Sequence, residues 1–188
     1  MHRSFFVFIL LTALVISCKE EATLPKPKGV LRLEYPNPKV ASYEDACPYT
    51  FEYNGLAQVK KDKGCNLTLE YPSMKGSIFL TYKPVEDNLK QLMIDADKLS
   101  YEHAAKADNI VPQVFENPED KVYGVFFTVT GNAASQTQFY VTDSINHFVT
   151  GSAYFKVKPN YDSILPAAHY LQRDIRHIME TLRWNTPQ

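Results

Sequence analysis

The sequence has little glycine, and it lacks the glycine and cysteine patterns on which several common sites depend. Seven of the 188 residues are glycine, and they form neither a phosphate-binding loop nor a G-x-S-x-G turn for a nucleophilic serine. The three cysteines include no C-x-x-C pair, and the histidines show no ligand spacing relative to them. We therefore expect no cofactor and no metal.

The sequence also lacks an excess of charge of either sign. Its formal net charge is -1, and Lys and Arg are scattered among acidic residues rather than gathered into a basic field. Nucleic acid is thus an unsuitable partner, because phosphate binding needs clustered positive charge. The chain does have 45% hydrophobic and 13% aromatic residues, which is enough to build the core of one domain.

The first residues predict a lipoprotein signal peptide. A short basic head at residues 1–3 precedes an uncharged apolar run at residues 5–16, and Val15-Ile16-Ser17-Cys18 resembles a lipobox. The alternative is a plain membrane anchor, but a bilayer span needs about 20 apolar residues and this run is shorter. We expect residues 1–17 to be removed and Cys18 to carry the lipid, which places the protein in the cell envelope as a membrane-anchored lipoprotein, on the periplasmic side or at the outer membrane.

A tether and one domain are expected after the lipid site. Residues 18–29 contain two prolines and little to bury, which is typical of an extended linker. At about 3.1 Å per residue such a linker spans roughly 30 Å. Residues 30–186 are then predicted to form a single α+β domain.

Cys47 and Cys65 remain after lipidation, on either side of a strand-like run at residues 49–53. An even pair of cysteines in an oxidising envelope favours a disulfide, and closing a loop of this size stabilises a fold by roughly 3 kcal/mol. Two independent buried thiols are the alternative.

Residues 122–166 predict the centre of the fold. Three runs with alternating apolar residues are joined by short turns at residues 131–134 and 143–146, as expected for an antiparallel three-stranded meander. Further strands are predicted at residues 31–35, 49–53, 66–71 and 76–82.

Two helices are predicted from apolar residues at helical spacing. The first runs from about Glu86 to Ala107, and the second from about Ser163 to Arg183. The predicted fold class is α+β, with a single antiparallel β-sheet and two main helices packed on it, similar to the Mog1/PsbP-like fold. The first stripe is Leu89, Leu92, Met93, Ala96 and Leu99; the second is Ala168, Leu171, Ile175, Ile178 and Leu182.

Polar residues gather at the turns and ends of the meander. Asp143, Ser144 and His147 have the residue types of a catalytic triad, but Asp143 and Ser144 are neighbours in a hairpin turn, where such side chains usually bond their own backbone. We therefore expect no enzyme, and the polar set either locks the turns or forms a docking patch for a partner. The set is Asn132, Ser135, Gln138, Asp143, Ser144, His147, Asn160, Tyr161 and Asp162.

The chain resembles the gliding-motility lipoprotein GldD family of Bacteroidetes. The resemblance lies in segments spread over the mature chain, among them residues 31–36, 80–85, 131–135 and 159–163. Asn66 departs from the family pattern, which has an aromatic residue after the second cysteine.

The resemblance implies a non-enzymatic envelope lipoprotein that is required for gliding and associated with type IX protein secretion. Its partners would be other envelope proteins of that apparatus, with no small-molecule substrate. An envelope ligand-binding or hydrolytic lipoprotein is the alternative function.

Overall fold

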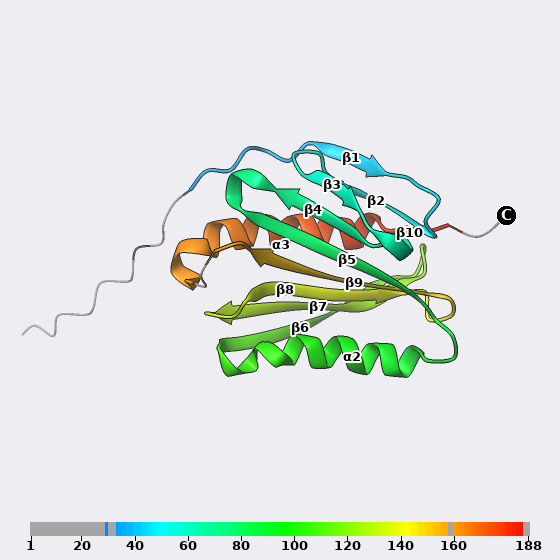
Figure 1. Cartoon of the computed structure of the whole chain (residues 1–188). Coiled ribbons are helices and arrows are strands. Elements are labelled where there is room, and N and C mark those ends of the chain that lie inside the picture. Colours follow the sequence, from blue (N-terminus) through cyan, green and yellow to red (C-terminus); the bar gives the residue numbers. More distant parts are fainter. Residues whose placement is uncertain (1–28, 30–32, 158–159, 186–188) are drawn as a thin grey trace, which may run out of the picture.

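The computed structural model describes residue 29, residues 33–157 and residues 160–185 (Figure 1). The signal peptide, Cys18 and all of the tether except Gly29 lie outside the described residues, as do Leu31 and Arg32 of the first predicted strand. The strands are β1 (Val40–Tyr43), β2 (Tyr49–Asn54), β3 (Gln58–Lys61), β4 (Leu67–Tyr71), β5 (Gly76–Pro84), β6 (Ala107–Asn117), β7 (Val122–Gly131), β8 (Ser135–Thr142), β9 (His147–Phe155) and β10 (Arg183–Trp184). The α-helices are α2 (Leu89–Tyr101) and α3 (Tyr161–Thr181), and short 3-10 helices are η1 (Lys63–Cys65), η2 (Pro72–Met74) and η3 (Glu102–Ala105).

The predicted meander is confirmed and lies inside the larger of two sheets. Seven strands pair in the order β3-β4-β5-β9-β8-β7-β6, so β9 is the central strand. All of these neighbours are antiparallel. Short connections account for the neighbours that follow one another in the chain, because a strand that reverses within a few residues pairs antiparallel with its predecessor. The pairing of β5 with β9 joins strands that are far apart in sequence.

The prediction of a single sheet is wrong, because β2 does not join the larger sheet. It pairs instead with β1 on one side and with β10 on the other, in a separate three-stranded sheet. Trp184 of β10 pairs with Tyr49 of β2, which closes the small sheet with residues from the far end of the chain. The likeness to the Mog1/PsbP-like fold stays a prediction.

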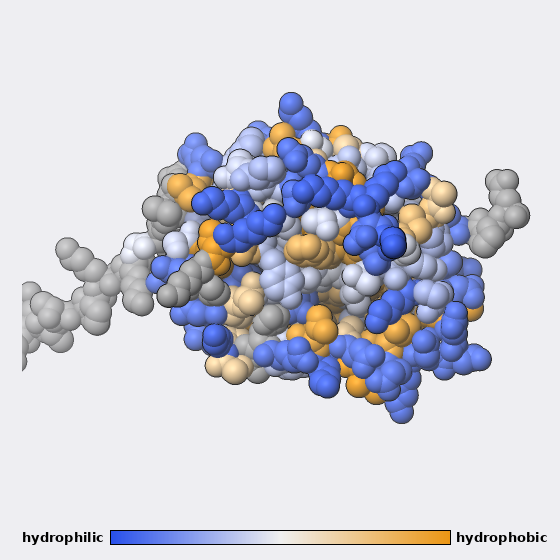
Figure 2. All heavy atoms as spheres, in the orientation of Figure 1, coloured by the Kyte–Doolittle hydropathy of each residue, from blue (hydrophilic) through white to orange (hydrophobic). Residues whose placement is uncertain are grey.

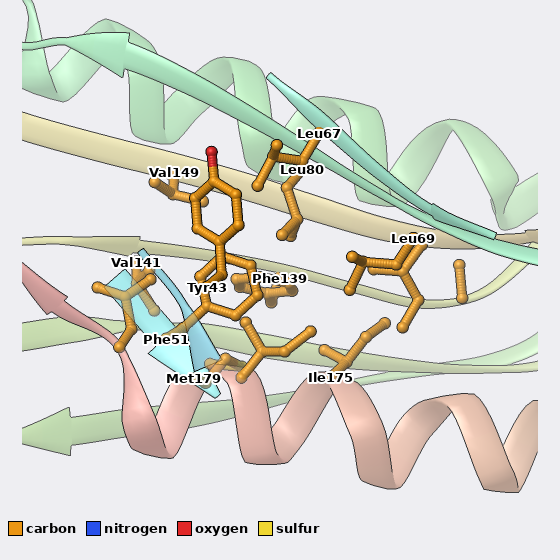
Figure 3. Close-up of a cluster of buried hydrophobic side chains, with 14 of the residues drawn as sticks. Tyr43, Phe51, Leu67, Leu69, Leu80, Phe139, Val141, Val149, Ile175 and Met179 are labelled. Atoms are coloured by element: carbon orange, nitrogen blue, oxygen red, sulfur yellow. The ribbon is translucent and has the colours of Figure 1, made fainter. Parts of the chain in front are cut away.

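The two helices cover opposite faces of the large sheet. Alternate residues of a strand point to opposite faces, and Phe126 packs in the core beside α3 whereas Phe127 packs beside α2. The small sheet lies on the α3 side, where its Phe51 joins the same core. In Figure 3, Ile175 and Met179 of α3 point toward Phe51 and Phe139.

The second helix is confirmed in type and buried face, with shifted ends. Its apolar stripe is buried: Leu171 and Ile175 are both 0% exposed. The helix ends at Thr181 because Leu182 adopts an extended conformation (φ -63°, ψ 134°), and Arg183 belongs to β10 rather than to the helix. The helix begins at Tyr161, two residues before the predicted start at Ser163.

The first helix is shorter than predicted. It begins at Leu89, since Asp87 has a left-handed backbone (φ 56°) that a helix cannot contain. Ala107, the predicted end of this helix, begins the edge strand β6, which was not predicted.

The apolar stripe of α2 is only partly buried, which corrects its assignment to the core. Leu92 is 7% exposed, whereas Leu99 is 53% exposed. Leu92 and Ser100 are the buried residues of this helix, against eight in α3. Helix α2 is therefore held by far fewer core side chains than α3.

The first described residues are fastened to α3. The Tyr170 hydroxyl donates to the carbonyl of Pro36 at 2.9 Å, and the Tyr35 and Tyr170 rings lie 5.3 Å apart. Asn54 of β2 donates to Tyr170 at 2.8 Å and to Asp174 at 3.0 Å. This buried polar group joins the start of the domain to the small sheet and to α3.

Candidate functional site

Eight of the nine polar residues predicted as a docking patch are divided between two ends of the large sheet. Asn132 and Ser135 lie at the β7–β8 end of β8, and Asp143, Ser144 and His147 lie at its β8–β9 end. The eight residues of β8 separate these ends by roughly 24 Å at the usual rise of a strand. Gln138 lies within β8, between the two ends.

Asp143 holds the β8–β9 turn together. Its Oδ1 atom accepts the backbone N–H groups of Ile145, Asn146 and His147 at 2.9, 2.8 and 2.9 Å. Partial burial disfavours the charged form, but these three hydrogen bonds outweigh it and lower the pKa of Asp143 below its usual value. The prediction that this aspartate bonds its own turn is confirmed by these contacts.

His147 is engaged away from Ser144. Its Nδ1 atom shares a 2.9 Å hydrogen bond with the Tyr82 hydroxyl, and its ring stacks on Trp184, with centroids 5.2 Å apart and planes at 18°. Ser144 has a left-handed backbone (φ 68°) and is exposed in the turn. In a catalytic triad the aspartate would orient this histidine through its side chain, whereas here the carboxylate bonds backbone N–H groups.

The apex of this turn exposes an isoleucine that the sequence analysis did not select. Ile145 is 67% exposed between the exposed Ser144 and Asn146. We call Ser144, Ile145, Asn146, His147 and Trp184 the turn end. Ile145 could have been identified from the sequence as an aliphatic residue at the centre of an otherwise polar turn, where folding provides no place to bury it.

The turn end rests on an aromatic row that leads to the disulfide. The Tyr82 ring lies 6.0 Å from His147 and 5.9 Å from Tyr49, and the Tyr49 hydroxyl donates to the carbonyl of Cys65 at 2.6 Å. The predicted disulfide is confirmed: Cys47 and Cys65 are bonded, with Cα atoms 5.6 Å apart. It links the loop before β2 of the small sheet to η1, which connects β3 and β4 of the large sheet.

The residues at the opposite end support the fold. The Asn132 side chain accepts the backbone N–H of Tyr161 at 2.9 Å, which joins the β7–β8 turn to the start of α3. Ser135 is fully buried and donates to the carbonyl of Thr137 at 3.1 Å. Asn160 and Asp162 flank Tyr161 at the beginning of α3, whose first turn gains from the negative charge of Asp162.

Gln138 faces α2 at the floor of a cleft. Its side chain is 3% exposed, and the Ser100 hydroxyl lies 3.3 Å from its Oε1 atom. The cleft has a volume of about 250 Å³ and lies between α2 and strands β5, β9 and β8. Figure 2 shows this side of the molecule, where pale and orange atoms lie between strongly blue side chains above and the region of α2 below. Asp143, Ser144 and His147 do not line this cleft.

Among the residues that the structure describes, no group of three or more His, Cys, Asp or Glu side chains is placed to hold a metal ion. Of the described helices, none has both the length and the apolar character needed to cross a bilayer.

These features define a two-sheet α+β domain, stapled by one disulfide, whose triad-like residues build a turn. The family model for the gliding motility lipoprotein GldD matches residues 20–184. The chain therefore belongs to the GldD family of gliding motility lipoproteins, as the sequence resemblance predicted. A search of curated proteins gave no match to this chain. Membership of a lipoprotein family fits an envelope protein anchored to a membrane.

Proposed function

We propose that this gliding motility lipoprotein is a non-enzymatic assembly component of the type IX secretion apparatus, tethered to the membrane and binding other envelope proteins through the turn end. Family membership supports the role in gliding. The non-enzymatic role is supported by the geometry of Asp143, whose carboxylate bonds three backbone N–H groups.

The observation that carries the proposal is an apolar apex on a rigid turn. Ile145 is 67% exposed, and the bonds to Asp143 fix the backbone on which it stands. Trp184, which stacks on His147 in the turn end, is a residue type enriched where interfaces are strongest. A preorganised surface loses little conformational entropy on binding, so this turn is suited to docking.

Ile145→Ser tests the proposal more cleanly than changes at Asp143. The side chain is exposed, so the substitution should leave the melting temperature almost unchanged. Val40→Ser is the matched control, because Val40 is a β-branched residue with 65% exposure on the small sheet. We expect Ile145→Ser, but not Val40→Ser, to remove the crosslinked envelope partners and to abolish gliding or type IX secretion at equal protein level.

Two results would replace this proposal. An unchanged partner set with normal motility in Ile145→Ser cells would make the turn end purely structural. Hydrolysis of an ester or peptide by the purified protein, lost in a Ser144→Ala variant, would favour the enzyme alternative.

A further inference from the structure

The cleft beneath α2 combines an apolar lining with a few polar groups, as small-molecule sites do. Leu92, Tyr140 and Phe148 contribute apolar surface, while Thr81, Thr150 and Ser152 place hydroxyl groups along the floor. An engineered cavity of about 150 Å³ holds benzene, and this cleft of about 250 Å³ has room for a six-membered ring with substituents.

The amide of Gln138 is the unusual group in the cleft. Its Nε2 atom is buried without a hydrogen-bond partner. The neighbouring Ser100 hydroxyl has one proton, for which the Ala96 carbonyl at 3.1 Å and Gln138 Oε1 at 3.3 Å compete. Rotating the amide by half a turn would pair Nε2 with Ser100 but leave Oε1 unpaired, so one amide atom is unsatisfied in either orientation.

An unsatisfied amide costs the folded state stability. A leucine of similar volume would avoid that cost at this position and would give up only the 3.3 Å contact with Ser100, whose hydroxyl also reaches the Ala96 carbonyl. A bound group that pairs with the amide would account for the glutamine.

We propose that the cleft binds an N-acylated amino sugar, with its acylamido group paired to Gln138 and its hydroxyl groups facing Thr81, Thr150 and Ser152. Phe79, 41% exposed at the cleft and held edge-on against Tyr154 with centroids 5.8 Å apart, offers a ring surface for the sugar. This inference is independent of partner binding at the turn end.

Other ligand classes fit the cleft less well. An extended peptide carries a row of backbone groups that need a free strand edge, yet β5, β9 and β8 are each paired on both sides. A hydrocarbon chain would leave both the Gln138 amide and the hydroxyl lining unpaired. A compact ligand with one amide and several hydroxyl groups satisfies the lining.

Binding requires the last turn of α2 to move outward, because the Nε2 atom is covered in the unliganded protein. The small number of buried residues in α2, Leu92 and Ser100, makes that movement inexpensive compared with any displacement of α3.

The test uses the full lipoprotein in lipid nanodiscs, titrated with the trimer of N-acetylglucosamine in a calorimeter. The deacetylated trimer and cellotriose are ligand controls that lack the acylamido group, and N-acetylalanine methylamide represents a peptide amide. Gln138→Leu should weaken binding about tenfold or more, as expected for loss of a buried hydrogen bond, while keeping or raising the melting temperature.

Gln136→Leu is the matched control variant. Gln136 lies in the same strand, is 4% exposed and also has an unpaired amide oxygen, but it does not line the cleft. Its variant should bind the acetylated trimer like the wild type. Ala96→Phe, which fills the cleft from the helix side, should abolish binding without touching the amide.

The expected result is binding of the acetylated trimer alone, weakened about tenfold or more in Gln138→Leu and abolished in Ala96→Phe. Equal binding of cellotriose, tighter binding of the peptide amide, wild-type affinity of Gln138→Leu or no binding of the acetylated trimer would each overturn the proposal.

Discussion

The Asp143 carboxylate accepts the backbone N–H of His147 at 2.9 Å and thereby closes the β8–β9 turn across four residues. Two more backbone N–H groups reach the same oxygen atom. The stability of the apex that carries Ile145 therefore depends on the charge of a carboxylate that the triad interpretation would have assigned to catalysis.

The first prediction follows from the lowered pKa of Asp143. Because the folded protein holds this proton less tightly than the unfolded chain, its stabilising contribution is present above the unfolded pKa of about 3.9 and disappears as the pH falls through the lower folded value. Asp143→Ala should cost about 1–2 kcal/mol at pH 7, and the difference from wild type should shrink toward pH 2.

Urea unfolding of both proteins between pH 7 and pH 2 measures this effect. The control is Glu119→Gln, a substitution at an exposed residue of the β6–β7 connection, which should follow the wild-type curve. A constant difference between Asp143→Ala and wild type at all pH values would show that the charge does not stabilise the turn.

The second prediction concerns the disulfide between Cys47 and Cys65. It closes the only covalent ring in the described part of the chain and joins the two sheets, so the Cys47→Ser, Cys65→Ser double variant should lose about 3 kcal/mol of unfolding free energy. Reduced wild-type protein should match the double variant. Two thiols that titrate freely in denatured, unreduced protein would contradict the bond.

The third prediction tests the main core. Ile175 is 0% exposed within the core that α3 shares with both sheets, so Ile175→Asp should prevent stable folding because an unpaired charge would be buried. His169→Asp places the same charge on the exposed side of α3 and should change stability by about 0.5 kcal/mol at most. Similar melting temperatures for the two variants would mean that the buried face of α3 is misassigned.

The fourth prediction concerns Cys18, which precedes the described residues. Cys18→Ala should abolish acyl labelling and either release the protein from membranes or leave the uncleaved precursor, because two or three acyl chains at this residue are the expected anchor. Metabolic labelling with an alkyne fatty acid, followed by membrane fractionation, measures both effects. Labelling that persists in the variant would place the lipid elsewhere.

The sequence predicted those parts of the fold that depend on local patterns. The meander followed from alternation and short turns, and the buried stripe of α3 followed from helical spacing. The second sheet did not, because the pairing of Trp184 with Tyr49 joins residues far apart in the chain. Two residues of β10 are too few to show any strand periodicity.

The site was predictable to a similar extent. Asp143 was recognised as a turn residue because aspartate in a short turn usually bonds its own backbone. The aromatic row through Tyr82 and His147 and the unpaired amide of Gln138 depend on which strands become neighbours, and no spacing in the sequence encodes that. The exposure of Leu99 was missed because an apolar stripe does not reveal whether anything covers it.

The hydrogen bond from Tyr170 to the carbonyl of Pro36 fixes the place at which the chain enters the domain. The chain enters the domain beside the first half of α3, whereas the β8–β9 turn lies at the other end of the strands (Figure 1). If the lipid is attached at Cys18, a force on the anchor is transmitted to the domain at Tyr35 and Pro36, and from these residues to α3. The apex at Ile145 would then lie at the end of the domain opposite the attached one, so the long axis of the sheet would separate the proposed docking surface from the anchored end.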